Sequence, residues 1–354
     1  MRLAGLDLYR YALPFSEPVA LKESVLEYRE GLLIRLTAED GSSGWGEAAP
    51  LPGFSRETLE DATEQLRGLA ASMPGGEVSV EMLDRADLAP SVRFGLELAA
   101  HNLSAKPSKN VLARPPKHPN RKAVFVNGLL SVFGGGMVEE ARRMRAAGYR
   151  AAKLKVGGRG EPGDARLVRE VGEALGDGVS LRLDANRAWG FGEALAFGRG
   201  VSGVRVEYVE EPLAEPGRLR ELIGRWGLPV ALDESLVGMG PEGLGRHRYA
   251  RAVVLKPTLL GGLSRALRLA GEAKALGMRV VVSSSYESGV GTGALVALAA
   301  AVGEEPVGLD TYRRLAEDVI EVPLDLPAPV VDVRRATEAA RRVDVRKIEP
   351  LPLD

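Results

Sequence analysis

The chain has 354 residues, 47 basic and 48 acidic side chains, a net charge of −1 and a hydrophobic content of 45%. This balance gives no electrostatic basis for binding nucleic acid or an anionic membrane, and the length suits a large domain with a smaller one. The lack of cysteine excludes disulfides, thiolate nucleophiles and cysteine-ligated metals. Without a signal-peptide pattern or an apolar bilayer-spanning stretch, we expect a soluble cytoplasmic protein.

The first third of the chain is predicted to form an α+β domain, because alternating apolar residues are followed by helical patterns. Ser55 precedes acidic residues and is the expected N-cap of the first helix. We assign residues 1–115 to this capping domain and expect the C-terminal segment 325–354 to complete it. Strands are expected at residues 2–11, 31–37 and 44–48, and helices at residues 55–72 and 91–104.

Residues 106–122 are rich in proline and basic side chains, which is more typical of a solvated linker than of a nucleic-acid patch in a chain that is otherwise not basic. After it, eight short apolar runs alternate with helical segments. This alternation predicts a (β/α)8 barrel, an α/β fold, over residues 116–324. The expected strands are residues 123–127, 152–156, 180–184, 206–210, 229–233, 252–256, 279–283 and 306–310.

Charged residues stand at or next to the ends of five consecutive predicted strands, the second to the sixth. They are Lys155, Asp184, Glu210, Asp233 and Lys256. Barrel enzymes build their active sites from residues at this end of several strands. A single charged residue at such a place is more often a helix cap or a surface ion pair. Five of them in strand order, with lysines outside and carboxylates inside, favour one shared site.

The three carboxylates are hard oxygen ligands on rigid elements, which suits Mg²⁺, with Mn²⁺ as the alternative. Lys153 and Lys155 lie on the same face of their strand because side chains alternate along it. A metal site of this kind can bind a small-molecule carboxylate and stabilise the enediolate formed when the α-proton leaves. The metal and Lys153 both disfavour a second ammonium group, so the pKa of Lys155 is expected to be lowered toward that of a working base.

The K-x-K pair, D-x-N, E-E-P, D-E-S and the later lysine resemble the muconate-lactonizing branch of the enolase superfamily, in which a lysine or histidine base works with Mg²⁺. Five longer segments more specifically resemble the o-succinylbenzoate synthase family. These are GEAAPLPGFSRET at 46–58, LRLDANRAW at 181–189, RAVVLKPTLLGGL at 251–263, VVSSSYESGVG at 281–291 and GLDTY at 308–312. The resemblance implies a lyase of menaquinone biosynthesis that dehydrates 2-succinyl-6-hydroxy-2,4-cyclohexadiene-1-carboxylate to o-succinylbenzoate.

The resemblance also implies a role for each matching residue. Lys155 is the base, helped by Lys153, and Lys256 is the opposite lysine, whose ammonium lies over the substrate ring. The implied metal ligands are Asp184, Glu210 and Asp233, with Glu211 a less favoured choice than Glu210. The residues implied around them are Arg182, Asn186 and Glu234, and those implied to bind substrate are Ser284, Ser285, Glu287, Ser288 and Gly289. The capping loops 19–24 and 50–55 would close over the site, with Lys22 or Phe54 touching the substrate.

Related activities remain open as alternatives. N-acylamino-acid racemases use the same two lysines. Dipeptide epimerases carry an Asp-x-Asp at the eighth strand end, where this chain has only Asp310. A barrel that only binds a metal would need neither lysine, and a Schiff-base aldolase would not need three carboxylates. The sequence leaves open whether the protein is a monomer or a homo-oligomer.

Overall fold

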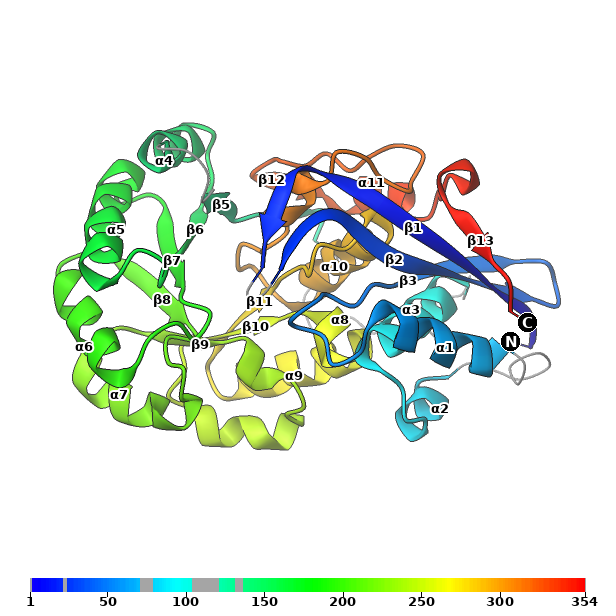
Figure 1. Ribbon diagram of the computed structural model, residues 1–354, viewed down its shortest axis with the longest axis horizontal. Helices are drawn as coiled ribbons and strands as arrows, with labels where there is room; N and C mark the ends of the chain where they lie inside the picture. The colour runs from blue at the N-terminus through cyan, green and yellow to red at the C-terminus, as the bar shows by residue number, and fades with distance from the viewer. Residues whose placement is uncertain (1, 22–23, 71–78, 104–120, 131–135, 354) are drawn as a thin grey trace.

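The computed structural model describes residues 2–21, 24–70, 79–103, 121–130 and 136–353. Two sheets organise the chain, an antiparallel sheet of four strands and a parallel sheet of seven. In Figure 1 the parallel strands lie inside an arc of helices, and the antiparallel sheet lies to one side of that arc. Within the described residues, no helix is both long and apolar enough to cross a membrane.

The antiparallel sheet has the order β13-β1-β2-β3 and carries helices on one face. Alternate residues of β1 and β2, such as Leu8 and Ile34, are buried against helix residues such as Leu66 and Leu96. Gly46 of β3 lies so close to α3 that a Cβ there would overlap the Gly95 carbonyl. The elements are β1 (Leu3–Ala20), β2 (Val25–Ala38), β3 (Ser43–Ala48), β13 (Glu349–Leu351), α1 (Leu59–Ala70), α2 (Val80–Arg85) and α3 (Pro90–Leu103).

Two details of this part differ from the sequence-based expectation. The first two strands are longer than predicted, because their antiparallel pairing continues through Pro14, opposite Tyr28, where the apolar alternation has already failed. Helix α1 begins after Thr58, whose hydroxyl accepts the amide of Asp61 and whose own amide donates to the Asp61 carboxylate. The Ser55 hydroxyl instead accepts the amide of Leu51. Ser72, Ser104 and residues 106–120 lie outside the described residues.

The parallel sheet confirms the predicted (β/α)8 barrel. Its strands follow one another in chain order from β5 to β11. Residues 307–308 close the ring, since Val307 bridges Val126 and Gly308 bridges Ser283. The strands are β5 (Gly128–Leu130), β6 (Ala151–Lys155), β7 (Ser180–Asp184), β8 (Val206–Glu210), β9 (Val230–Leu232), β10 (Ala252–Leu255) and β11 (Arg279–Val282). The helices are α4 (Met137–Ala146), α5 (Glu161–Leu175), α6 (Phe191–Gly200), α7 (Leu219–Trp226), α8 (Pro257–Leu260), α9 (Leu263–Ala275) and α10 (Gly289–Val302).

The first predicted barrel strand, residues 123–127, is displaced along the chain. Its first half is β4 (Ala123–Phe125), which pairs antiparallel with β12 (Val330–Asp332). The barrel position is taken by β5, where Leu130 pairs with Leu154 of β6. The cause is a partner strand about two hundred residues away, which no local pattern near residue 123 could indicate.

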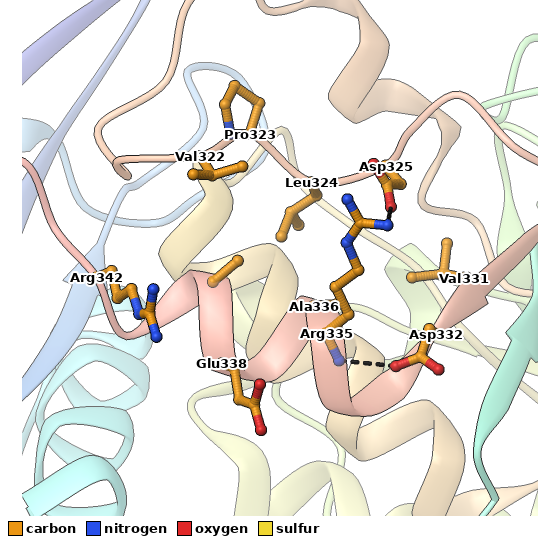
Figure 2. A pocket seen from close by; sticks show the side chains of 11 residues that line it. Val322, Pro323, Leu324, Asp325, Val331, Asp332, Arg335, Ala336, Glu338 and Arg342 are labelled. Carbon is orange, nitrogen blue, oxygen red and sulfur yellow. Dashed lines mark hydrogen bonds and ion pairs between the residues drawn. The ribbon is translucent and has the colours of Figure 1, made fainter.

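The C-terminal segment contributes to both parts of the molecule. Strand β13 joins the antiparallel sheet, with Leu351 opposite Leu8 of β1. Helix α11 (Val333–Ala340) packs on α10 and forms one wall of a small surface pocket, across which Arg335 pairs with Asp325 at 2.8 Å (Figure 2). The domain division at residues 115/116 and 324/325 stays a prediction.

Candidate active site

The charged strand ends converge because the strands are neighbours in register. Lys155 of β6 lies opposite Asp184 of β7, which in turn lies opposite Glu210 of β8. Glu210 pairs with Ala231 of β9, two residues before Asp233. Neighbouring parallel strands lie about 4.8 Å apart, so the carboxylates form one row across the barrel mouth.

The lysines make direct contacts with this row. Lys153 Nζ lies 2.7 Å from Asp184 Oδ2 and 2.6 Å from Glu210 Oε2. Lys256 Nζ lies 2.5 Å from Asp233 Oδ2 on the other side. Lys153 is therefore a counter-ion of Asp184 and Glu210, whereas Asp233 has a separate counter-ion, Lys256, which follows β10.

Burial sets the protonation of this cluster. It raises the pKa of Glu210 to about 7 and that of Asp233 to about 6, in spite of the nearby ammonium groups. It acts in the same direction on Asp184, but Lys153 and Lys155 outweigh it and lower that pKa to about 2. The carboxylates of Asp184 and Glu210 outweigh desolvation at Lys153 and raise its pKa well above the ordinary value. Burial and the nearby charges together therefore disfavour the ionised form of Glu210 and Asp233 and favour that of Asp184.

Lys155 differs from the other two lysines. Desolvation lowers its pKa, the nearby Asp184 carboxylate opposes that shift, and the ammonium groups of Lys153 and Lys256 lower it further. A lysine with a lowered pKa carries more neutral amine near pH 7, and this is the form that can accept a proton. The charges around Lys155 therefore suit it to act as a base, as the sequence predicted.

Lys155 and Lys256 line a cavity at the barrel mouth. Phe54, one of the two capping-loop residues predicted to touch substrate, is in its wall, with its ring centroid 5.9 Å from Lys256 Nζ. Lys22, the other, lies outside the described residues. Leu21 and Leu51, also in the wall, belong to the two capping loops predicted to close over the site. Sequence reasoning missed other wall residues, among them Asn127, Leu129, Ser283, Tyr286 and Thr311.

The three carboxylates fit a hard divalent ion by their chemistry. Asp184, Glu210 and Asp233 are 3%, 2% and 4% exposed, and all are oxygen donors from rigid strand ends. As the side chains stand, no three acidic or histidine groups of the described ranges already enclose a metal position. Lys153 and Lys256 contact one oxygen of each carboxylate, and a bound divalent ion would add positive charge to the row.

The residues predicted around the carboxylates divide into two groups. The Asn186 amide donates to Asp184 Oδ1 at 3.0 Å, and its side chain donates to Glu234 Oε1 at 3.3 Å, so both residues lie beside the row. Arg182 lies one layer deeper in the barrel. Its guanidinium donates to Glu207 at 2.8 Å and to the Asn127 side chain at 3.1 Å. These contacts are to residues other than the three carboxylates, and they hold Arg182 in the barrel interior, where its partner Asn127 lines the cavity.

Of the five predicted substrate-binding residues, Ser284 lines the cavity and the other four make contacts inside the protein. The Ser285 amide donates to Glu287, which also accepts the hydroxyl of Thr258. Ser288 donates to Glu47 of the capping sheet, and the Gly289 amide donates to Asp318. The S-S-S-Y-E-S motif could have indicated the lining residues more fully, because Ser283 and Tyr286 belong to the same motif as Ser284 and also line the cavity.

A closed parallel barrel with charged residues gathered at its strand ends is the architecture of a barrel enzyme, and the family models place this barrel in the enolase-type class. Residues 136–337 match the family model described as enolase C-terminal domain-like, and residues 1–103 match the MenC N-terminal domain. Two solved structures share the fold. Muconate lactonizing enzyme from Pseudomonas fluorescens has a TM-score of 0.85 at 23% identity and 98% coverage of both chains. N-succinyl Arg/Lys racemase from Bacillus cereus has a TM-score of 0.82 at 21% identity, over 99% of this chain and 94% of that one.

Sequence relatives narrow the class. The o-succinylbenzoate synthase of Pectobacterium atrosepticum is 35% identical over 96% of this chain and 97% of its own length. That of Edwardsiella ictaluri is 36% identical over 88% and 92%. The chain belongs to the o-succinylbenzoate synthase family.

Proposed function

We propose that this protein is a cytoplasmic o-succinylbenzoate synthase that dehydrates 2-succinyl-6-hydroxy-2,4-cyclohexadiene-1-carboxylate. The observation that carries the proposal is the pair of lysines that line one cavity beside three buried carboxylates, in a member of this family. The reaction needs a base near neutral pH and a sink for negative charge, which Lys155 and an ion held by the three carboxylates would supply.

Lys155 takes the α-proton of the substrate on its neutral amine, and the C–H electron pair moves into the carboxylate to give an enediolate. The pair then returns to form the new ring double bond as the C–O bond breaks. The same proton then passes from Lys155 to the departing hydroxyl, so that water leaves and the amine is restored. Lys256, held by Asp233, keeps its ammonium form and stabilises negative charge on the opposite side of the ring.

Asp184, Glu210 and Asp233 would hold Mg²⁺, or Mn²⁺ in its place. The ion would neutralise the charge that develops on the substrate carboxylate when the α-proton is lost. Asn186 and Glu234 would orient the first of these ligands through their contacts beside it.

A turnover assay tests the proposal. The purified protein is offered the cyclohexadiene carboxylate with Mg²⁺, with and without EDTA, and loss of the diene absorbance is followed. N-succinyl amino acids in deuterated water are run alongside. We expect metal-dependent dehydration without α-deuterium exchange. Exchange without dehydration would move the function to an N-acylamino-acid racemase, and activity on neither substrate would overturn the proposal.

A further inference from the structure

Arg29 of β2 is a deeply buried cation, with 1% of its surface exposed. A guanidinium has five N–H donors, and here each one meets a backbone carbonyl. Nε donates to Tyr286 at 3.0 Å, and Nη1 donates to Glu30 and Pro50 at 2.9 Å each. The remaining group, Nη2, donates to the carbonyls of Ala49 and Ser285.

Two of these carbonyls belong to the start of the capping loop. Ala49 and Pro50 precede a tight turn in which the Leu51 carbonyl accepts the amides of Phe54 at 3.0 Å and Ser55 at 2.8 Å. The Ser55 hydroxyl accepts the Leu51 amide and closes the turn. Arg29 therefore fixes the origin of the loop that places Leu51 and Phe54 in the cavity wall.

Two other carbonyls belong to the barrel loop after β11. Tyr286 has a φ of 62°, a left-handed conformation that is uncommon for a non-glycine residue and persists only where its surroundings impose it. Its carbonyl accepts from Arg29, and its ring meets Phe15 edge-on at 5.6 Å. Tyr286 is one of the barrel residues that line the cavity.

A separate contact docks the capping sheet on the barrel. The Glu47 carboxylate accepts the amide and hydroxyl of Ser288, at 2.8 and 2.7 Å, and the amide of Gly291 at 2.7 Å. It also accepts the hydroxyl of Tyr11. Since Glu47 holds the two parts together at the start of α10, the contribution of Arg29 is separable from docking.

We propose that Arg29 is a positioning residue for substrate recognition, which sets the spacing between the two walls of the cavity. One wall is the turn that carries Phe54, and the other is the loop that carries Tyr286. Arg29 is outside the cavity lining and acts only through these segments. The inference rests on the proposed function, because the walls would enclose parts of the substrate away from the reacting atoms.

The substitution Arg29→Lys tests this role, because a lysine keeps the charge but lacks the planar fork that reaches five carbonyls. Loss of wall contacts that are equal in ground and transition states raises KM by about 10-fold or more and leaves kcat within about 3-fold. The pH profile of kcat stays unchanged because the surroundings of Lys155 are untouched.

Two controls lie on the same strand. Arg35→Lys changes a guanidinium that packs on Trp45 at 5.6 Å, and Leu36→Ala lowers stability through the capping core. Both leave KM within about 3-fold of the wild-type value, since neither touches the walls. If Leu36→Ala, at an equal loss of Tm, raised KM as much as Arg29→Lys, the effect would be one of stability and the proposal would be wrong.

Amide hydrogen exchange without substrate gives a readout that needs no activity. In Arg29→Lys, residues 49–55 and 284–287 both exchange faster, while α3 and the barrel strands keep their protection. Loosening of only one segment would overturn the link between the walls. A wild-type protein without turnover would overturn the proposed function, and the exchange result alone would then decide whether Arg29 joins the walls.

Discussion

At the scale of single residues, the proposed base Lys155 and the counter-ion Lys153 are the same kind of side chain in opposite surroundings. Lys153 and Lys155 lie two positions apart on β6, yet the pKa of Lys153 is raised by its carboxylate contacts and that of Lys155 is lowered by burial. A K-x-K pair in sequence does not distinguish these roles. The contacts in the structure distinguish the two lysines, because Lys153 Nζ lies within 2.7 Å of both Asp184 and Glu210.

Lys155→Ala should reduce turnover by a factor of about 10²–10⁴, the usual contribution of a positioned base, and should leave metal affinity nearly unchanged. Steady-state kinetics and Mn²⁺ titration measure the two effects. Lys274→Ala, on the outer face of α9, is the matched control and should affect neither. Loss of metal binding together with turnover would show that Lys155 supports the carboxylates instead of serving as the base.

The adjacent glutamates of E-E-P make separate sets of contacts, Glu210 with Lys153 and Glu211 with other partners. Glu211 is fully buried, and its carboxylate accepts the amides of Asp233 and Ser235, the Ser235 hydroxyl and the Arg187 guanidinium. Glu211→Gln should therefore destabilise the fold by about 1.5–3 kcal/mol, the usual range for lost hydrogen bonds to a charged group.

Glu210→Gln should instead abolish metal binding, because it removes a proposed metal-binding carboxylate. Its cost in stability should be smaller than that of Glu211→Gln, because burial disfavours the ionised form of Glu210. Urea unfolding and calorimetric metal titration on both variants check the pair. The opposite result, with metal binding lost in Glu211→Gln and kept in Glu210→Gln, would exchange their assignments.

At the scale of elements, patterns within single segments predicted the barrel and the convergence of the charged strand ends, whereas long-range pairings were missed. The parallel strands were predictable from the sequence because they form short apolar runs, five of which end at or next to a charged residue. Strand β4 was misplaced because its partner β12 lies far along the chain. Arg29 gave no signal, since its bond to Tyr286 spans 257 residues and its acceptors are carbonyls that every residue has.

Close packing of β3 on α3 gives an element-scale prediction. Gly46→Ala should destabilise the protein by about 1–3 kcal/mol or more, because its Cβ would overlap the α3 backbone, which cannot yield as a side chain can. Gly5→Ala on β1 is the control, since no atom lies within 4 Å of its Cβ, and it should change stability by less than about 1 kcal/mol. Equal effects in thermal unfolding would show that β3 and α3 are not in tight contact.

At the scale of the whole molecule, metal binding and folding should be coupled. An ion that binds only the folded carboxylate row stabilises the protein by about 2.7 kcal/mol at a hundred times its Kd. Mg²⁺ should therefore raise the Tm of EDTA-treated protein, and Glu210→Gln should abolish the rise. A rise of equal size in that variant would place the metal elsewhere.

The contact of Glu47 with the start of α10 limits the design of chimeric proteins, in which the capping sheet of one protein is joined to the barrel of another. A carboxylate on β3 accepts three donors of the barrel, including the amides of Ser288 and Gly291. A capping sheet transplanted from another protein of this fold would dock only if it brought an acid to this position and left Gly291 room beside it. Grafts made for new specificity should therefore be cut so that β3 and the first turn of α10 come from the same parent.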